Sequence, residues 1–275
     1  MQSADLHMHT IASDGQKTYQ EVIDEAKSQQ LTHIAITNHD TVEELDAAMT
    51  YANKHGLVLI PAMELSTVYQ GHSVHVLAYF KHDGHRHPNV KDYGENLKAS
   101  RIERAKRMLD KLKEHYGLEL DINVLWQQAN GVVARPHMAA TIVHHYPQYT
   151  YDEVFEKFIG NNSKAYIPTA KMSLDEGLKF LKEHNALAIC AHPGLLKEPV
   201  MEAVLAHPFD GLELQYPLHT KQQIRSFQRF IDRHDWLYTA GSDYHGIPND
   251  TKHGAIGDCR LEGAALNRFL KTLNA

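Results

Sequence analysis

A chain of 275 residues, 43% of them hydrophobic, is long enough for one large α/β domain or for a domain with a sizeable insertion. It has no apolar run of about 18 residues and no N-terminal segment that is first basic and then apolar. We therefore expect no membrane span, no signal peptide and a cytoplasmic location. The net charge of −6 argues against a surface that binds duplex nucleic acid stably. The two cysteines lack CxxC spacing, whereas the 21 histidines favour metal binding.

The first expected strand carries two histidines, in the segment DLHMHTIASDG at residues 5–15. His7 and His9 are two residues apart, so both imidazoles leave one face of a strand while the apolar residues beside them leave the other. Asp14 follows in a polar turn just past the strand, where a carboxylate can join the same site.

Strands and helices then alternate along the chain. The segment HIAITNHD at residues 33–40 and apolar runs at 58–61 and 73–80 predict strands. Capping-box patterns predict helix starts at residues 18–21, 41–44, 150–153, 173–176 and 220–223. Strands that alternate with helices imply βα units and a mostly parallel sheet.

Residues 91–165 interrupt this alternation. The stretch that begins KDYGENLKASRIERAKR is long, charged and helical, and further helical segments are expected at residues 122–130, 138–145 and 151–159. The α/β pattern then returns with the strands ALAICAHP, GLELQY and LYTAGSDYHG. We therefore predict a barrel domain made of residues 1–90 and 166–275, with a small helical insertion subdomain at residues 91–165.

Nine histidines and carboxylates lie at the ends of the expected strands: His7, His9, Asp14, His39, Glu64, His75, His192, Asp243 and His245. In a parallel barrel those ends share one rim, so the nine side chains can converge there. Nitrogen and oxygen donors without thiolates suit two or three divalent ions such as Mn²⁺, Zn²⁺ or Fe²⁺. A single histidine that ends a strand is more often a packed or capping residue than a ligand. The joint pattern is what favours a metal site.

These motifs resemble those of the polymerase and histidinol phosphatase (PHP) family of metal-dependent phosphoesterases. DLHMHT with SDG, NHDT, the Glu of AMELS, His75, AHP and GSDYHG occur in that family's order and cover almost the whole chain. The segments ARPHMA at residues 134–139 and AYIP at residues 165–168 are most similar to the bacterial branch that has a helical insertion and acts on nucleoside 3′,5′-bisphosphates and RNA 5′ ends. The resemblance implies a distorted seven-stranded β/α barrel, (β/α)7, with a trinuclear metal site.

The resemblance also implies how the ions are held. It assigns one ion to His7, His9, Glu64 and Asp243, a second to Glu64, His75 and His192, and a third to Asp14, His39 and His245. The chain departs from the family at Asn38, where the family usually has Asp. The loss of this charge is expected to affect the orientation of His39 or the affinity for the third ion.

Metal ions also indicate the type of reaction. Paired ions lower the pKa of a bound water, so the predicted reaction is hydrolysis of a phosphate ester by a metal-bound hydroxide, without a Ser or Cys nucleophile. Asp40, His192 and His245 are candidates for proton transfer, although an Asp at the head of a helix more often caps it. The predicted substrate is a small nucleotide of the nucleoside 3′,5′-bisphosphate type or the 5′ end of a short RNA. Histidinol phosphate is the alternative substrate, and a non-catalytic metal-binding module or an amidohydrolase is the alternative class of protein.

Basic side chains of the insertion are candidates for binding the phosphate that does not react, because a guanidinium makes two parallel hydrogen bonds to a phosphate. Arg101 and Arg104 lie three residues apart on one expected helix, and Arg135 precedes another in ARPH. His137 and Lys164 are further candidates. Basic runs such as KASRIERAKR are more often solvated helix faces, and His137 is equally suited to capping its helix.

Overall fold

The computed structural model describes residues 2–128, 135–168 and 171–275. The chain forms two compact units, one made of Met1–Asp92 with Lys171–Ala275 and the other of Tyr93–Ala170. We call them the barrel unit and the helical unit. The insertion predicted from the sequence spans residues 91–165, and the helical unit spans residues 93–170.

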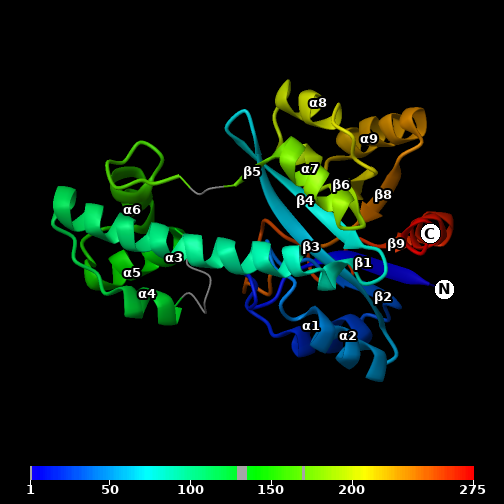
Figure 1. Ribbon diagram of the computed structural model, residues 1–275, viewed down its shortest axis with the longest axis horizontal. Coiled ribbons are helices and arrows are strands. Elements are labelled where there is room, and N and C mark those ends of the chain that lie inside the picture. Colours follow the sequence, from blue (N-terminus) through cyan, green and yellow to red (C-terminus); the bar gives the residue numbers. More distant parts are fainter. Residues whose placement is uncertain (1, 129–134, 169–170) are drawn as a thin grey trace. The chain divides into compact units, whose positions relative to one another are not determined.

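Within its described residues, the barrel unit is built on a nine-stranded sheet in the order β8-β7-β6-β4-β3-β2-β1-β9, with β5 paired to β3 (Figure 1). Its strands are β1 (Ser3–Met8), β2 (His33–Ile36), β3 (Val58–Tyr69), β4 (His72–Phe80), β5 (Met172–Ser173), β6 (Ala186–Cys190), β7 (Gly211–Gln215), β8 (Leu237–Ala240) and β9 (Leu261–Glu262). Met8 forms a parallel bridge with Tyr244, just beyond β8, and His9 N donates to Tyr244 O at 2.8 Å. This bridge nearly closes the sheet, so β1–β4 and β6–β8 form the distorted seven-stranded barrel that was predicted.

The hairpin of β3 and β4 departs from the mostly parallel arrangement expected from the sequence. β4 is antiparallel to both of its neighbours, β3 and β6. The turn residues Gln70 and Gly71 have positive φ, at 47° and 83°, as tight two-residue hairpin turns require. The register pairs Ser66 with His75. Since Glu64 and Ser66 leave the same face of β3, Glu64 and His75 lie on one face of the sheet.

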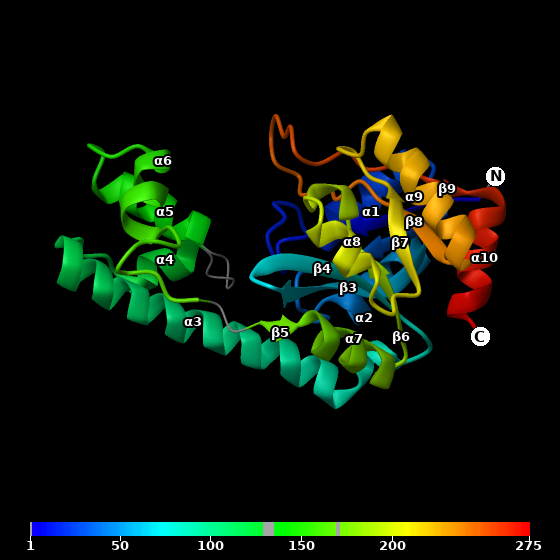
Figure 2. The ribbon, with the colours of Figure 1, turned by 90° about the horizontal axis from the view of Figure 1, so that it is seen from above.

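Helices pack against the strands of the barrel unit (Figures 1 and 2). They are α1 (Tyr19–Ser28), α2 (Leu45–Lys54), α7 (Leu174–Glu183), α8 (Val200–Leu205), α9 (Lys221–His234) and α10 (Gly263–Leu273), with the 3₁₀ turns η1 (Gly84–Arg86) and η3 (Pro193–Leu195). The apolar side of α10 joins the core formed by β1, β4, β6 and β8. There Phe269 packs edge-on against Tyr79 at 5.0 Å between ring centroids, and the Tyr79 hydroxyl donates to Leu6 O at 2.8 Å.

Capping boxes begin several helices where the sequence predicted them. Thr18, Ser173 and Thr220 cap α1, α7 and α9 by accepting a hydrogen bond from the backbone three residues later. α2 begins after Glu44, whose side chain makes no cap hydrogen bond. The Glu44 carboxylate instead accepts a hydrogen bond from the Thr10 hydroxyl at 2.7 Å. The box predicted at the start of α2 is therefore wrong, because Glu44 holds the loop that follows β1.

The helical unit packs short helices against a long one (Figure 2). Its elements are α3 (Pro88–Tyr116), which begins within the barrel unit, α4 (Ile122–Gln128), α5 (Arg135–His145), α6 (Tyr151–Val154) and the π-helical turn η2 (Phe155–Ile159). Ala105, Leu109 and Leu112 of α3 pack in one core with residues of α4, α5 and η2, as their spacing predicts. The end of the helix predicted at 122–130, and Ala134 of the ARPHMA segment, lie outside the described residues. In the parts of the chain that are described, none of the helices has the length and apolar character needed to cross a membrane.

Candidate metal centre

Strand ends and loops of the barrel unit bring the nine predicted ligands into one cluster. Glu64 and His75 lie within β3 and β4, and the others lie in or after β1, β2, β6 and β8. The donor atoms fall into overlapping sets, each within 4.8 Å: His9, Asp14, His39 and His245; His7, His9, Glu64 and Asp243; and His39, Glu64 and His75. His192 joins them through Glu64.

Glu64 lies in the middle of this cluster and has different partners on its two carboxylate oxygens. Glu64 Oε2 lies 3.2 Å from His7 Nε2 and 3.1 Å from His9 Nε2. On the other side, Oε1 lies 2.9 Å from His75 Nδ1 and 3.1 Å from His192 Nε2. A carboxylate placed in this way can serve two ions at once, and the shared role of Glu64 remains a prediction.

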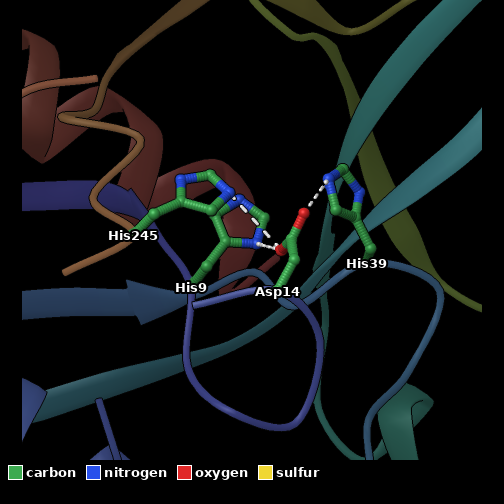
Figure 3. Close-up of side chains that lie close together, drawn as sticks. All are labelled: His9, Asp14, His39 and His245. Atoms are coloured by element: carbon green, nitrogen blue, oxygen red, sulfur yellow. Dashed lines mark ion pairs between the residues drawn. The ribbon is translucent and has the colours of Figure 1, made fainter. Parts of the chain in front are cut away.

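The Asp14 carboxylate lies among three imidazoles, those of His9, His39 and His245 (Figure 3). Asp14 Oδ1 lies 3.4 Å from His9 Nδ1 and 3.4 Å from His245 Nε2, and Oδ2 lies 3.5 Å from His39 Nε2. The second nitrogen of His39, Nδ1, lies 3.4 Å from Glu64 Oε2. His39 therefore faces Glu64 as well as Asp14. His9 faces Asp14 as well as Glu64 and Asp243. The expected ligand sets did not include the contacts of His39 with Glu64 and of His9 with Asp14.

Buried donor atoms without hydrogen bonds show that the cluster fits divalent ions. Asp243 Oδ1 lies 3.1 Å from Nε2 of both His7 and His9. Nevertheless Asp243 Oδ1, His9 Nε2 and His39 Nδ1 are buried and make no hydrogen bond to the described residues. Unpaired buried polar atoms are costly, whereas lone pairs that converge on one point suit a metal ion. Imidazole nitrogens and carboxylate oxygens are the donors that Mn²⁺, Zn²⁺ and Fe²⁺ accept.

The carboxylates of the cluster change the pKa values of the buried imidazoles. Burial by itself lowers the pKa of His7 and of His9, but the surrounding carboxylates outweigh it. They raise the pKa of His7 well above its usual value and that of His9 to about 9. Burial dominates at His39 and lowers its pKa to about 4. An ion that binds His9 must therefore displace a proton.

Two glycines of the sequence motifs allow the backbone to approach the ligands closely. A Cβ on Gly241 would collide with the Cβ of His7, and one on Gly15 would lie 2.7 Å from the backbone carbonyl of His9. Asp243 has a φ of 53°, which non-glycine residues rarely adopt and which is found preferentially at functional sites. The glycines of SDG and GSD are thus required by packing around the ligands.

Glu213 is a functional residue that the sequence analysis missed. It is fully buried in β7, where Oε1 lies 2.9 Å from His7 Nδ1 and Oε2 accepts a hydrogen bond from His192 N at 2.8 Å. A carboxylate in this position fixes the ring of His7 and leaves Nε2 to face the metal site, as is common behind metal-binding histidines. The signal in the sequence was a Glu between Leu212 and Leu214 in an apolar strand.

Asn38 acts on the loop that carries Asp14. Its Oδ1 accepts hydrogen bonds from Thr10 N at 2.8 Å and from Ser13 Oγ at 2.9 Å. Its Nδ2 donates to Thr10 Oγ1 at 2.8 Å. The departure from the family therefore bears on the loop around Asp14, in addition to the neighbouring His39.

Asp40 has a structural contact in addition to the role predicted for it. Its Oδ1 accepts a hydrogen bond from Ser66 N at 2.7 Å, and the residue is 2% exposed. Its expected alternative role as a helix cap is wrong, because α2 begins only at Leu45. Proton transfer by Asp40, His192 or His245 remains a prediction.

The helical unit holds three of the predicted substrate residues close together. Arg104 Nε donates to a backbone carbonyl at 2.6 Å, and Arg135 donates to Asn161 Oδ1 at 2.7 Å. Their guanidinium carbons lie 5.8 Å and 5.2 Å from the ring centroid of Tyr166. Burial, and then the charges of Arg135 and Arg101, lower the pKa of Arg104. Such concentrated positive charge suits a phosphate.

The other two predicted substrate residues also belong to the helical unit. His137 is half-buried near the start of α5, and its carbonyl accepts a hydrogen bond from Thr141 Oγ1 at 2.8 Å. The side chain of Lys164 is exposed, while its backbone N donates to the Tyr116 hydroxyl at 3.2 Å. Substrate binding by these two residues remains a prediction.

Comparison with known proteins identifies the family. The PHP domain matches residues 5–195, a span that contains all the candidate ligands except Asp243 and His245. The chain belongs to the PHP domain family. This PHP protein is 26% identical over 254 residues to the 5′-3′ exoribonuclease Rnm of Salmonella typhimurium, covering 88% of this chain and 84% of that protein. It is also 26% identical over 253 residues to the 3′,5′-nucleoside bisphosphate phosphatase of Chromobacterium violaceum, covering 89% and 88%.

A solved structure agrees with this assignment. The structure of a Bifidobacterium adolescentis protein, described as a metal-dependent phosphoesterase, matches with a TM-score of 0.79 at 27% identity, covering 99% of this chain and 96% of that one. The PHP protein is thus a metal-dependent phosphoesterase, a hydrolase, as the sequence predicted. The metals themselves and their number belong to the proposal below.

Proposed function

We propose that this PHP protein hydrolyses a phosphate ester of a nucleoside 3′,5′-bisphosphate or of the 5′ end of a short RNA. Similarity to a nucleoside bisphosphate phosphatase and to an exoribonuclease supports this substrate class. The observation that carries the proposal is the presence, in one chain, of the metal cluster of the barrel unit and the arginine cluster of the helical unit. A substrate with two phosphates needs one site for the reacting phosphate and another for the phosphate that remains.

The barrel unit would hold two or three divalent ions of Mn, Zn or Fe. The residues that would hold them are His7, His9, Glu64 and Asp243; Glu64, His75 and His192; and Asp14, His39 and His245, with His9 also next to Asp14. Such ions, when bound, supply an activated water and neutralise the phosphate oxygens. The chain's own contribution is to orient these ligands through Glu213 and to move a proton, for which Asp40, His192 and His245 are the candidates.

The arginine cluster would bind the phosphate that does not react. Arg104 and Arg135 both lie against the ring of Tyr166, which restrains their guanidinium groups before any ligand binds. Restrained guanidinium groups lose less conformational freedom when they make paired hydrogen bonds to a phosphate. Arg101 adds positive charge beside them.

Hydrolysis by the full chain, loaded with Mn²⁺ or Zn²⁺, tests the proposal, with released inorganic phosphate measured for the two small substrates and released mononucleotide measured for the RNA. Adenosine 3′,5′-bisphosphate and a short 5′-phosphorylated RNA are compared with histidinol phosphate at equal concentrations. We expect faster release from the nucleotide substrates. His9→Ala should abolish it in a folded protein, whereas His115→Ala, exposed on α3, should not.

Each alternative predicts a different result. Faster release from histidinol phosphate would support that substrate instead. A non-catalytic module and an amidohydrolase both predict no release from any of the three, and that result would contradict the proposal. The nine ligand-competent side chains argue against a module that has lost its metal site.

A further inference from the structure

The turn that carries His192 has an unusual backbone conformation. His192 has a φ of 29° and a ψ of 55°, a left-handed conformation that residues other than glycine rarely adopt. It follows β6 and directly precedes η3, where Leu195 N donates to His192 O at 3.0 Å. Conformations of this kind persist only where surrounding contacts hold them. The contacts that hold this turn therefore determine where the imidazole of His192 lies beside Glu64.

His219, in the loop between β7 and α9, makes one of these contacts. Its Nε2 accepts a hydrogen bond at 3.1 Å from the backbone N of Gly194, two residues after His192. Its Nδ1 donates to Leu214 O, a carbonyl of β7, at 3.0 Å. Since a carbonyl oxygen can only accept, Nδ1 carries the hydrogen and Nε2 is left as an acceptor. The neutral ring of His219 thus connects the His192 turn to β7.

Gly194 allows this contact because it has no side chain. A Cβ on Gly194 would lie 2.6 Å from His219 Cδ2 and 2.9 Å from Gln223 Nε2. Gln223, in the first turn of α9, donates from Nε2 to Gly194 O at 2.9 Å. Both backbone polar groups of Gly194 are therefore bonded to side chains from the segment that follows β7. His219 is 7% exposed, so its ring has little room to move aside.

The same segment also contacts a ligand on another side of the metal centre. The ring centroid of Tyr216 lies 5.2 Å from that of His192 and 5.2 Å from that of His219. The Tyr216 hydroxyl donates to Asp243 Oδ2 at 3.2 Å. At the end of β7 itself, Glu213 Oε2 accepts from His192 N at 2.8 Å. His192 is thus held from β7 on its own backbone N, and through His219 on the turn that follows it.

We propose that His219 is a positioning residue of the metal centre, which holds the turn after His192 and so directs His192 Nε2 toward the ion shared with Glu64 and His75. This role rests on the ligand set of the proposed function, because it needs an ion at His192. A histidine that only fills the core predicts a different result, since its replacement would lower stability without changing the affinity for any one ion.

Two variants separate the two hydrogen bonds of His219. In His219→Gln the amide oxygen can take the place of Nε2 and still accept from Gly194 N. In His219→Asn the amide nitrogen can take the place of Nδ1 and still donate to Leu214 O, but the shorter side chain does not reach Gly194. His184→Asn is the matched control. His184 is 6% exposed, and its Nδ1 donates to Phe180 O at 2.7 Å just after the end of α7.

Titration of the full chain with Co²⁺, after depletion with a chelator, measures the effect. No substrate is used, so a wrong substrate class does not affect the result. Equilibrium dialysis gives the affinity of each bound ion, and the absorption spectrum reports its ligands. His219→Asn should bind one ion about 10–100-fold more weakly than wild type. His219→Gln and His184→Asn should bind every ion about as tightly as wild type, although denaturant unfolding should show lower stability for both asparagine variants.

Wild-type affinity for every ion in His219→Asn would overturn the proposal. Equal weakening in His219→Gln and His219→Asn would also overturn it, because the hydrogen bond to Gly194 would then not be the cause. So would equal weakening in His184→Asn, since loss of any buried histidine would then be sufficient. If His219→Asn does not fold, Gly194→Ala takes its place, because its Cβ must displace the His219 ring. An unchanged affinity in Gly194→Ala would then overturn the proposal.

Discussion

Replacing Glu213 with Gln tests whether the metal centre depends on the buried carboxylate behind His7. Glu213 accepts from two donors, with 2.9 Å to His7 Nδ1 and 2.8 Å to His192 N. Gln has the same size but only one acceptor oxygen, so its NH₂ group must face one of the two donors. A hydrogen bond to a charged group contributes about 1.5–3 kcal/mol, and a buried donor left unpaired costs about 1–3 kcal/mol.

The expected loss of metal affinity in Glu213→Gln is of similar size. Removing the partner of a metal-binding histidine weakens binding about 10–100-fold, or about 1.4–2.7 kcal/mol. Competition with a chromophoric chelator measures it. Asp210→Asn is the matched control, because exposed Asp210 precedes the same strand and accepts from Ala188 N at 2.8 Å. Equal metal affinity in the two variants would refute the role assigned to Glu213.

Three other positions allow equally direct measurements. Asn38→Asp should destabilise the loop after β1 by about 1–3 kcal/mol, because the Thr10 hydroxyl already donates to Glu44 and cannot donate to a second carboxylate. Denaturant unfolding should show this loss of stability in Asn38→Asp and its recovery in the double variant Asn38→Asp/Glu44→Gln. An unchanged stability of Asn38→Asp would contradict this prediction. Zinc binding at neutral pH should release protons and strengthen as the pH rises toward 9, because metal-free His9, with a pKa of about 9, is protonated. Calorimetry in buffers of different ionisation enthalpy counts the protons released on zinc binding, and a count of zero would contradict this prediction. Arg135→Ala should raise KM for a nucleoside 3′,5′-bisphosphate about tenfold and leave aryl phosphate hydrolysis nearly unchanged, whereas equal losses on both would indicate a structural role.

The barrel could be predicted because each main strand is an apolar run with a polar end. The direction of each strand could not be predicted, since alternating side chains indicate a strand but do not say whether it runs parallel or antiparallel to its neighbours. The reversal of β4 depends on the positive φ of Gln70 and Gly71, and Gln is a weak signal for such a turn. The start of α2 was missed for a similar reason, because Glu44 serves a loop distant in sequence rather than its own helix.

The metal ligands were recognisable as metal-binding residue types at the ends of strands, and two of the histidines share one short strand. The residues that hold these ligands in place are not marked by any regular spacing in the sequence. Glu213 lies 206 positions from His7, its partner. Contacts of this kind depend on how the barrel closes, which periodicity does not encode.

The division of the chain into two units has a consequence for specificity under the proposed function. Every candidate metal ligand belongs to the barrel unit, and the arginine cluster belongs to the helical unit. An aryl phosphate has no second phosphate, so its hydrolysis needs only the barrel residues. Under the proposed function, discrimination in favour of bisphosphates would depend on the arginine cluster of the helical unit. Changes within the helical unit should therefore alter KM and substrate preference while the number of bound ions stays constant, whereas a change at Glu213 should alter metal binding for every substrate alike.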